Sequence, residues 1–178
     1  MQRVSAKQLT TDYTNGQRKF PEIDLSQEDL FEIDLREIDL SQSNLTGAYL
    51  PYANLSQSQL QGTILVEAQM PDVKLYQANL SKANLEGVNL SRANLRQANL
   101  QGANLRGANL QEADLANANL QNADLTGANL SRANLDRANL AGSQLAGCSF
   151  FRARRVNFTD AKLDSTTITP DGHRQDFP

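Results

Sequence analysis

A large apolar residue occurs at every fifth position of the chain from Phe20 to Phe150, without a change of phase. All of these residues are Leu except Phe20, Met70 and Phe150. A small or short apolar residue, most often Ala, stands two positions before most of them, and Asn or Asp usually lies between the two. Each five-residue unit thus has two apolar positions separated by one polar residue, and two further residues, mostly polar, follow the second apolar position.

This period excludes the common regular structures. Residues five apart drift around the axis of an α-helix and form no apolar stripe, and on one continuous strand they fall on opposite faces. The pattern is satisfied when the chain turns a corner every five residues, because each Leu and the residue two before it then share the inner face of a short extended segment. Repeated corners form coils, and stacked coils form a solenoid.

The spacing of glycine predicts the number of sides in each coil. Glycine occurs two places after the Leu and recurs in two columns with a spacing of twenty, namely Gly47, Gly87, Gly107, Gly127 and Gly147, and Gly62, Gly102 and Gly142. This place suits the third residue of a type II turn, which needs positive φ. A four-sided coil of twenty residues explains the spacing. The column Arg92, Glu112 and Arg132 then predicts a ladder of charges on the surface.

The units Ala-Asn-Leu-Arg-Gln, Ala-Asn-Leu-Gln-Gly and Ala-Asp-Leu-Thr-Gly resemble the A(D/N)LXX repeat of the pentapeptide repeat proteins, a family with many cyanobacterial members. The resemblance extends over residues 20–168. It implies an all-β fold, the family's right-handed quadrilateral β-helix, with Leu and Ala inward and the other three positions outward. At twenty residues per coil we expect about seven coils and a rod roughly 30–35 Å long. The Asn and Asp residues beside the Leu are expected to bond backbone groups near the corners.

The N-terminal segment, residues 1–16, is predicted to be a capping helix. Ser5 is a candidate N-cap, Leu9 and Tyr13 share one helical face, and Gly16 is a favourable terminator. The stretch from Leu9 to Phe20 is also similar to the N-terminal cap of some family members.

At the other end the phase changes, because Arg155 stands where the next Leu is due and apolar residues resume at Phe158, Leu163 and Ile168. We therefore expect a bulge or loop at residues 151–155. The predicted segments are a regular β-helix at 17–150, a phase-shifted last coil at 151–170, and a C-terminal tail at 171–178 that folds back or frays.

Composition indicates a soluble cytoplasmic protein of one domain. The chain has 178 residues and a formal net charge of −3, too small to favour nucleic-acid or membrane binding. No apolar run approaches a membrane span, and residues 1–16 lack the apolar stretch of a secretory signal. The single cysteine, Cys148, occupies an inward position, so we expect a buried thiol and no disulfide.

The sequence offers no constellation for catalysis. His173 is the only histidine and lies in a C-terminal turn, so neither a His/Cys zinc site nor a Cys–His catalytic pair is expected. No phosphate-binding or dinucleotide-binding glycine motif occurs. We predict no enzymatic activity, no catalytic residues, no cofactor and no metal.

Two kinds of function remain open. The family resemblance implies one of them, because some members bind DNA gyrase or topoisomerase IV as acidic rods that imitate a duplex. The acidic run here lies in residues 22–39 and comprises Glu22, Asp24, Glu28, Asp29, Glu32, Asp34, Glu37 and Asp39, with Arg36 among them. Two observations argue against mimicry: Asp is an ordinary residue beside the repeat Leu, and the later coils contain many arginines.

The mimics resemble dimers joined at their C-terminal ends. Phe150, Phe151 and Phe158 could form such an interface, but a closing cap on a monomer needs the same residues. We expect a monomer in preference to this homodimer.

The other function is a structural or protein-interaction module for an unidentified protein partner, presenting side chains on a rigid rod; this is our prediction. Two features depart from the plain repeat: an apolar cluster and a basic segment. A simpler interpretation has the N-terminal helix or a loop covering the cluster, which we slightly favour, and the arginines solvated. The candidate surface comprises Phe31, Pro51, Tyr52 and Pro71, beside which Tyr49 lies, with Asp24, Asp29, Asp34, Asp39, Arg152, Arg154 and Arg155.

Overall fold

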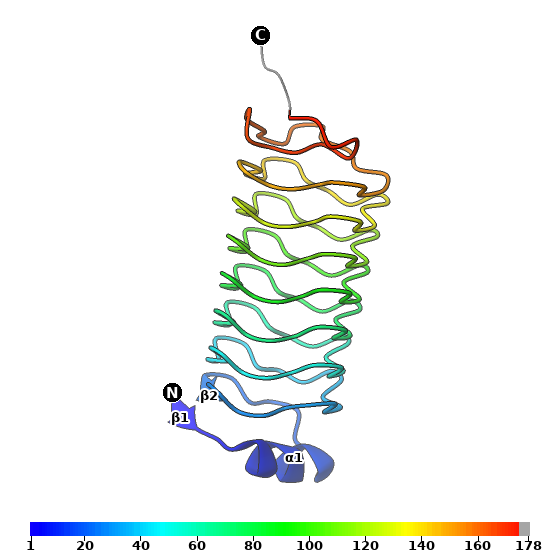
Figure 1. Ribbon diagram of the computed structural model, residues 1–178. Helices are drawn as coiled ribbons and strands as arrows, with labels where there is room; N and C mark the ends of the chain where they lie inside the picture. Colours follow the sequence, from blue (N-terminus) through cyan, green and yellow to red (C-terminus); the bar gives the residue numbers. More distant parts are fainter. Residues whose placement is uncertain (175–178) are drawn as a thin grey trace.

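The computed structural model describes residues 1–174, and its main body is a stack of coils (Figure 1). From Lys19 to Asn134, the residue before each large apolar residue pairs in parallel with the residue twenty positions later. Asp24 pairs with Asn44, for example, and Asn44 pairs with Ile64. Residues twenty apart therefore lie above one another, and each coil takes four five-residue units.

Each corner is closed by the same hydrogen bonds. The Ala48 N–H donates to the carbonyl of Leu45 at 3.0 Å, which completes a four-residue turn, and the N–H of Gly47 donates to Val66 in the next coil at 2.9 Å. The third residue of the turn has positive φ at every corner from Glu22 to Arg152. Most of these residues are not glycine. Positive φ is thus required on all four edges, and its cost of about 1–2 kcal/mol for an L residue is offset by the bonds of the turn and the ladder.

The interior is one continuous column of apolar side chains. Every Leu from Leu25 to Leu145 is at most 2% exposed, and the Ala row beside it is buried with it. The inward assignment of the Leu and Ala positions is therefore confirmed. The lumen is narrow, so the inward neighbour of the Leu is most often Ala, although Ile38 is buried beside Leu40.

The Asn between the two apolar positions bonds in two directions, as Asn99 illustrates. Its Oδ1 accepts the N–H of Gln101 at 3.2 Å, and its Nδ2 donates to Oδ1 of Asn79 in the coil before at 3.3 Å. Asn119 makes the same bond to Asn99 at 3.3 Å. An amide has both the donor and the acceptor that such a stack needs, whereas a carboxylate only accepts, so Asn predominates over Asp.

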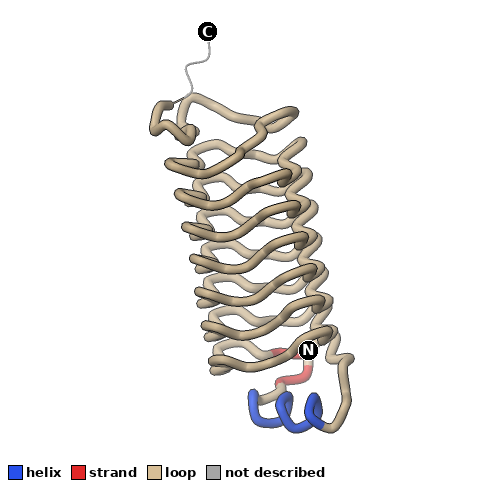
Figure 2. Tube along the Cα trace, turned by 90° about the vertical axis from the view of Figure 1, so that its right-hand side faces the viewer, coloured by secondary structure: helices blue, strands red, loops and turns tan. Residues whose placement is uncertain are grey.

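The N-terminus covers the first coil. Strand β1 (Gln2–Arg3) pairs in parallel with β2 (Ile23–Asp24), and helix α1 (Ala6–Thr14) lies across the end of the rod (Figure 2). The expected N-cap is confirmed, because Oγ of Ser5 accepts the N–H of Gln8 at 3.2 Å. Leu9 of α1 is fully buried.

A carboxylate that sequence reasoning assigned to the acidic run fixes this helix. Glu28 occupies the inward position two before Leu30, where other units have a small apolar residue. Its Oε2 accepts the N–H of Ala6 at 2.9 Å, and its Oε1 lies 3.4 Å from a guanidinium nitrogen of Arg3. Glu28 thus binds the first turn of α1, where carboxylates are favoured.

At the C-terminal end the register shortens later than expected. Arg154 still pairs with Asn134 twenty residues before it, so the expected bulge at 151–155 is wrong for its first four residues. The next pairs, Gln144 with Lys162 and Ser149 with Ile168, are separated by fewer residues, which places the shortening between 155 and 162. The part of the predicted tail at 175–178 lies outside the described residues.

Candidate interaction surface

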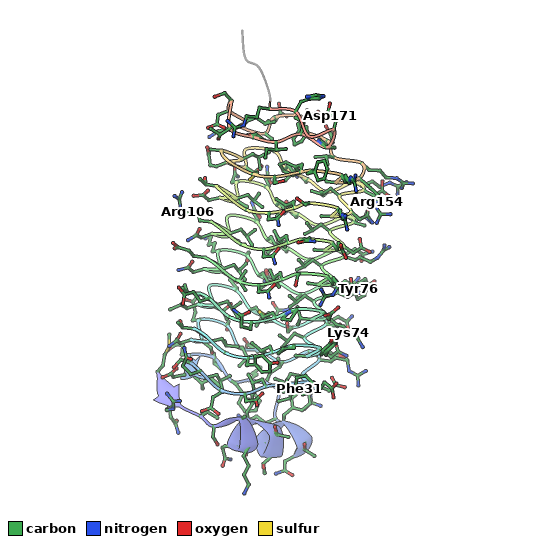
Figure 3. All side chains as sticks on the ribbon, viewed as in Figure 1. Phe31, Lys74, Tyr76, Arg106, Arg154 and Asp171 are labelled. Atoms are coloured by element: carbon green, nitrogen blue, oxygen red, sulfur yellow. The ribbon has the colours of Figure 1, made fainter. Side chains whose placement is uncertain are left out.

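Three aromatic side chains form the largest departure from the polar repeat surface. Phe31, Tyr49 and Tyr52, here called the aromatic cluster, are 49%, 46% and 52% exposed. Phe31 stacks on Tyr49, with ring centroids 6.3 Å apart and planes at 15°, and meets Tyr52 edge-on at 6.0 Å and 84°. The expectation that the N-terminal helix or a loop covers these rings is wrong, because all three are about half exposed. Helix α1 lies beneath the first coil, whereas Phe31 lies on the side of the rod (Figure 3).

The two prolines of the predicted surface stand in the backbone behind these rings. Pro51 is buried and Pro71 is half-buried, in the same twenty-residue column as Phe31. At most other corners this residue's N–H donates to the Asn or Asp two positions before it, as Ser56 does to Asn54 at 3.2 Å, but proline has no N–H. Because Pro51 has no N–H to donate, the side chain at position 49 does not have to accept a hydrogen bond. An aromatic residue, Tyr49, can therefore occupy this position. Pro51 itself is not part of the exposed surface.

Carboxylates lie on two sides of the aromatic cluster. Asp29 is the ladder partner of Tyr49, and its Oδ1 accepts the N–H of Phe31 at 3.1 Å. Glu32 follows Phe31 in the sequence and lies directly below Tyr52, in the same corner column. Within residues 1–174 neither Asp29 nor Glu32 forms an ion pair. On the other side of Tyr52, Asp72 binds Arg92 through two contacts at 2.6 and 2.9 Å.

The four predicted aspartates do not form one patch. Their ladder partners are Asn44, Tyr49, Asn54 and Gln59, which places Asp24, Asp29, Asp34 and Asp39 on four different sides of the first complete coil. Each accepts the N–H two residues later, at 2.9–3.4 Å.

The surroundings of two of these aspartates, Asp24 and Asp34, stabilise their charged forms. The N–H of Ser26 is the main cause that lowers the pKa of Asp24, and the side chain of Arg36 that of Asp34. The aspartates of the acidic run therefore lie around the rod and not on one face of it.

The three arginines lie at the other end of the molecule. The guanidinium of Arg152 is over the ring of Phe151 at 5.0 Å, and that of Arg155 binds Asp136 at 3.0 Å. Arg154 is exposed (Figure 3). The structure therefore does not bring the arginines together with the aromatic cluster.

The predicted charge ladder is present in a different pairing. Arg132 binds Glu112 at 3.3 Å, as expected, but Arg92 pairs with Asp72 in the coil before it rather than with Glu112. These exposed pairs contribute little to stability. In the corner column from Glu32 to Arg152, the two charges that follow Tyr52, Asp72 and Arg92, are therefore neutralised by each other.

The thiol is buried, as expected. Cys148 is inaccessible, and its Sγ donates to the carbonyl of Leu125 at 2.7 Å. Burial raises the pKa of Cys148 from 9.0 to about 12, so the thiol remains protonated at neutral pH. Within the described part of the chain, no group of three His, Cys, Asp or Glu residues is placed to hold a metal ion, and no helix is long and apolar enough to cross a membrane.

The architecture defines a class of protein: an all-β repeat rod with a helical end. The family model for Pentapeptide repeats matches eight copies, over residues 29–66, 53–92, 74–112, 113–150 and 128–169. The chain therefore belongs to the pentapeptide repeat family, as the sequence predicted. Proteins of this family are right-handed quadrilateral β-helices, and they are generally structural or binding proteins rather than enzymes. No curated protein matches the chain.

Solved structures of the same family are similar. Full-length QnrB1, a plasmid-mediated fluoroquinolone resistance protein, is 14% identical with a TM-score of 0.52, over 93% of this chain and 88% of that one, which supports the fold. HetL, involved in heterocyst differentiation regulation in the cyanobacterium Nostoc sp. strain PCC 7120, is 27% identical over 97% of this chain and 100% of that one, with a TM-score of 0.39. Rfr23 of the cyanobacterium Cyanothece 51142 is 27% identical over 92% and 99%, with a TM-score of 0.27.

Proposed function

We propose that this chain is a non-enzymatic protein-interaction module, a right-handed rod of about seven coils that acts in the cytoplasm as a monomer. Its mechanism is the presentation of outward side chains at fixed spacing by a backbone whose coils are bonded to one another along all four sides.

One observation carries this proposal: the aromatic cluster is exposed on a surface where the repeat elsewhere places polar residues. Large exposed rings on a polar protein are typical of a partner-binding surface. The backbone of Tyr49 is fixed by hydrogen bonds to Glu28 and Leu30, and Phe31 stacks on its ring. Binding would therefore order few side chains, which favours affinity.

Duplex mimicry has less support. A mimic needs carboxylates along the length of one face, whereas the aspartates of the first coil are distributed around the rod and bonded to its own backbone. Further along, arginines neutralise the carboxylates, as Arg106 does Asp124 at 3.1 Å.

Site-specific photo-crosslinking in the native cell tests the proposal. A photoreactive amino acid replaces one outward corner residue on each of the four edges in turn: Gln61, Arg106, Phe31 and Gln97. A binding module forms a discrete crosslinked product from one edge or two adjacent edges. If all four positions yield no product, or the same unselective products, the proposal is contradicted.

A further inference from the structure

We propose that the aromatic cluster binds an arginine-bearing segment of a protein partner. This inference rests on the proposed function and adds the location and the chemistry of the interface. The guanidinium would stack on the ring of Phe31, beside the ring of Tyr52, and its N–H groups would reach Asp29 and Glu32.

The first argument comes from two of the chain's other accessible aromatic rings, Tyr13 and Phe151, which its own arginines cover. Arg18 lies over the ring of Tyr13 at 3.9 Å, and Arg152 lies over the ring of Phe151 at 5.0 Å. Within residues 1–174 no cation lies over Phe31, Tyr49 or Tyr52, although these rings are about half exposed. An aromatic face attracts a guanidinium more strongly as water is excluded, so these rings offer a site that the chain itself does not fill.

The second argument is the sign of the surrounding charge. Asp29 and Glu32 flank Phe31 in the sequence and have no ion-pair partner among the described residues. The nearby Arg92 is held by Asp72 through two contacts, so it does not neutralise them. The surface thus combines apolar rings with uncompensated negative charge. Such a surface repels acidic peptides, nucleic acids and anionic membranes, and it favours a basic segment.

Arginine fits this surface better than lysine. Its guanidinium is planar, so it can lie flat on a ring while its N–H groups point outward in the plane toward carboxylates. A carboxylate beside an aromatic ring, as Asp29 and Glu32 are beside Phe31, matches that arrangement. The ammonium of lysine is more strongly hydrated and cannot make both contacts in one orientation.

Titration of the isotope-labelled full chain with synthetic peptides, followed by NMR, tests the inference. The probes are four short Gly/Ser peptides of equal length, with two Arg, two Lys, two Glu, or two Pro residues. We expect the Arg peptide to shift backbone resonances of residues 29–32 and 49–52 in a saturable way. The Lys peptide should bind several-fold more weakly, and the Glu and Pro peptides should leave these resonances unchanged.

Matched variants separate the cluster from general acidity. Phe31→Ser should weaken binding of the Arg peptide roughly ten-fold. The fold tolerates Ser at this position, because the same column has Ser at positions 91 and 131. Glu32→Gln should also weaken binding, whereas Glu37→Gln, a carboxylate at the next corner of the same coil, should leave it within about two-fold. Equal effects of the two Glu variants, equal binding of the Arg and Pro peptides, or saturable shifts elsewhere would overturn the inference.

The two proposals fail separately. If crosslinking finds a partner from another edge while the Arg peptide leaves the cluster unchanged, the protein is a binding module and the assigned surface is wrong. If no edge crosslinks but the Arg peptide binds the cluster, the surface is correct in its chemistry and the proposed function is contradicted.

Discussion

Replacing Asn99 tests the physical reason for the Asn row, which runs along all four sides of the rod. Asn99 makes three hydrogen bonds: it accepts from the backbone of Gln101 and from Asn119, and it donates to Asn79. Each neutral hydrogen bond contributes about 0.5–1.5 kcal/mol net. Because Asn99 is half-buried, water replaces part of this loss, and we expect Asn99→Ala to lower the free energy of unfolding by about 2 kcal/mol.

A graded series makes the prediction specific. Asn99→Asp keeps both acceptor bonds but loses the donor, and it places a carboxylate beside Oδ1 of Asn79, so it should cost about 1 kcal/mol. Gln101→Ala removes an exposed side chain and keeps the N–H, so it should change stability by less than about 0.5 kcal/mol.

Equilibrium urea unfolding followed by circular dichroism gives the free energy of unfolding of all three variants. If Asn99→Ala is as stable as Gln101→Ala, the ladder of side-chain amides does not contribute to folding. If Asn99→Asp is as unstable as Asn99→Ala, the two hydrogen bonds that Oδ1 of Asn99 accepts do not contribute to the free energy of unfolding.

Four further predictions follow from the core, the thiol, the N-terminal helix and the charges. Ala108→Leu should overfill the lumen and cost about 1–3 kcal/mol in urea unfolding, and a stability equal to wild type would contradict the inward position. Cys148 should not react with a thiol reagent at pH 8 until the protein unfolds. Because the pKa of Cys148 is raised in the folded state from 9.0 to about 12, the free energy of unfolding should fall as the pH rises above 9, by up to about 1.4 kcal/mol per pH unit. The variant Cys148→Ala should lack this slope. Glu28→Ala should accelerate hydrogen exchange across α1 and leave the Leu rows protected; unchanged exchange in α1 would mean that Ala6 does not depend on this carboxylate. A large excess of the protein should not inhibit DNA supercoiling by gyrase, and inhibition at stoichiometric protein would restore the mimic hypothesis.

The five-residue period was sufficient to predict the core because a corner every five residues leaves few other ways to bury both apolar positions. The corner residues were harder to predict. Positive φ at Arg92 or Arg137 has no signal in the side chain; at Arg92 the backbone bond to Gln111 in the next coil favours it. The burial of Pro51 and the exposure of Phe31 likewise could not be read from the sequence, because both belong to the same column.

The acidic run shows how sequence order and spatial order differ on this fold. Neighbouring units lie on different sides, so the aspartates of one run face four directions, while residues twenty apart share an edge. Glu28 had a detectable signal, a charged residue at an inward position, which indicates that something polar must approach that end of the core. The identity of that group, the first turn of α1, depends on the path of the chain between residues 3 and 28 and has no separate signature in the repeat.

The stacking of residues twenty positions apart underlies both the proposed function and the assigned surface. Pulsed electron spin resonance between spin labels at Gln57 and Arg137, and at Glu37 and Arg137, measures it directly, since these residues occupy one corner column with the native Cys148 inaccessible. At ~4.8 Å per coil the backbone separations are about 19 and 24 Å. We predict two narrow distance distributions that differ by about one coil spacing. Broad distributions, or equal mean distances for the two pairs, would contradict a rigid rod with this register.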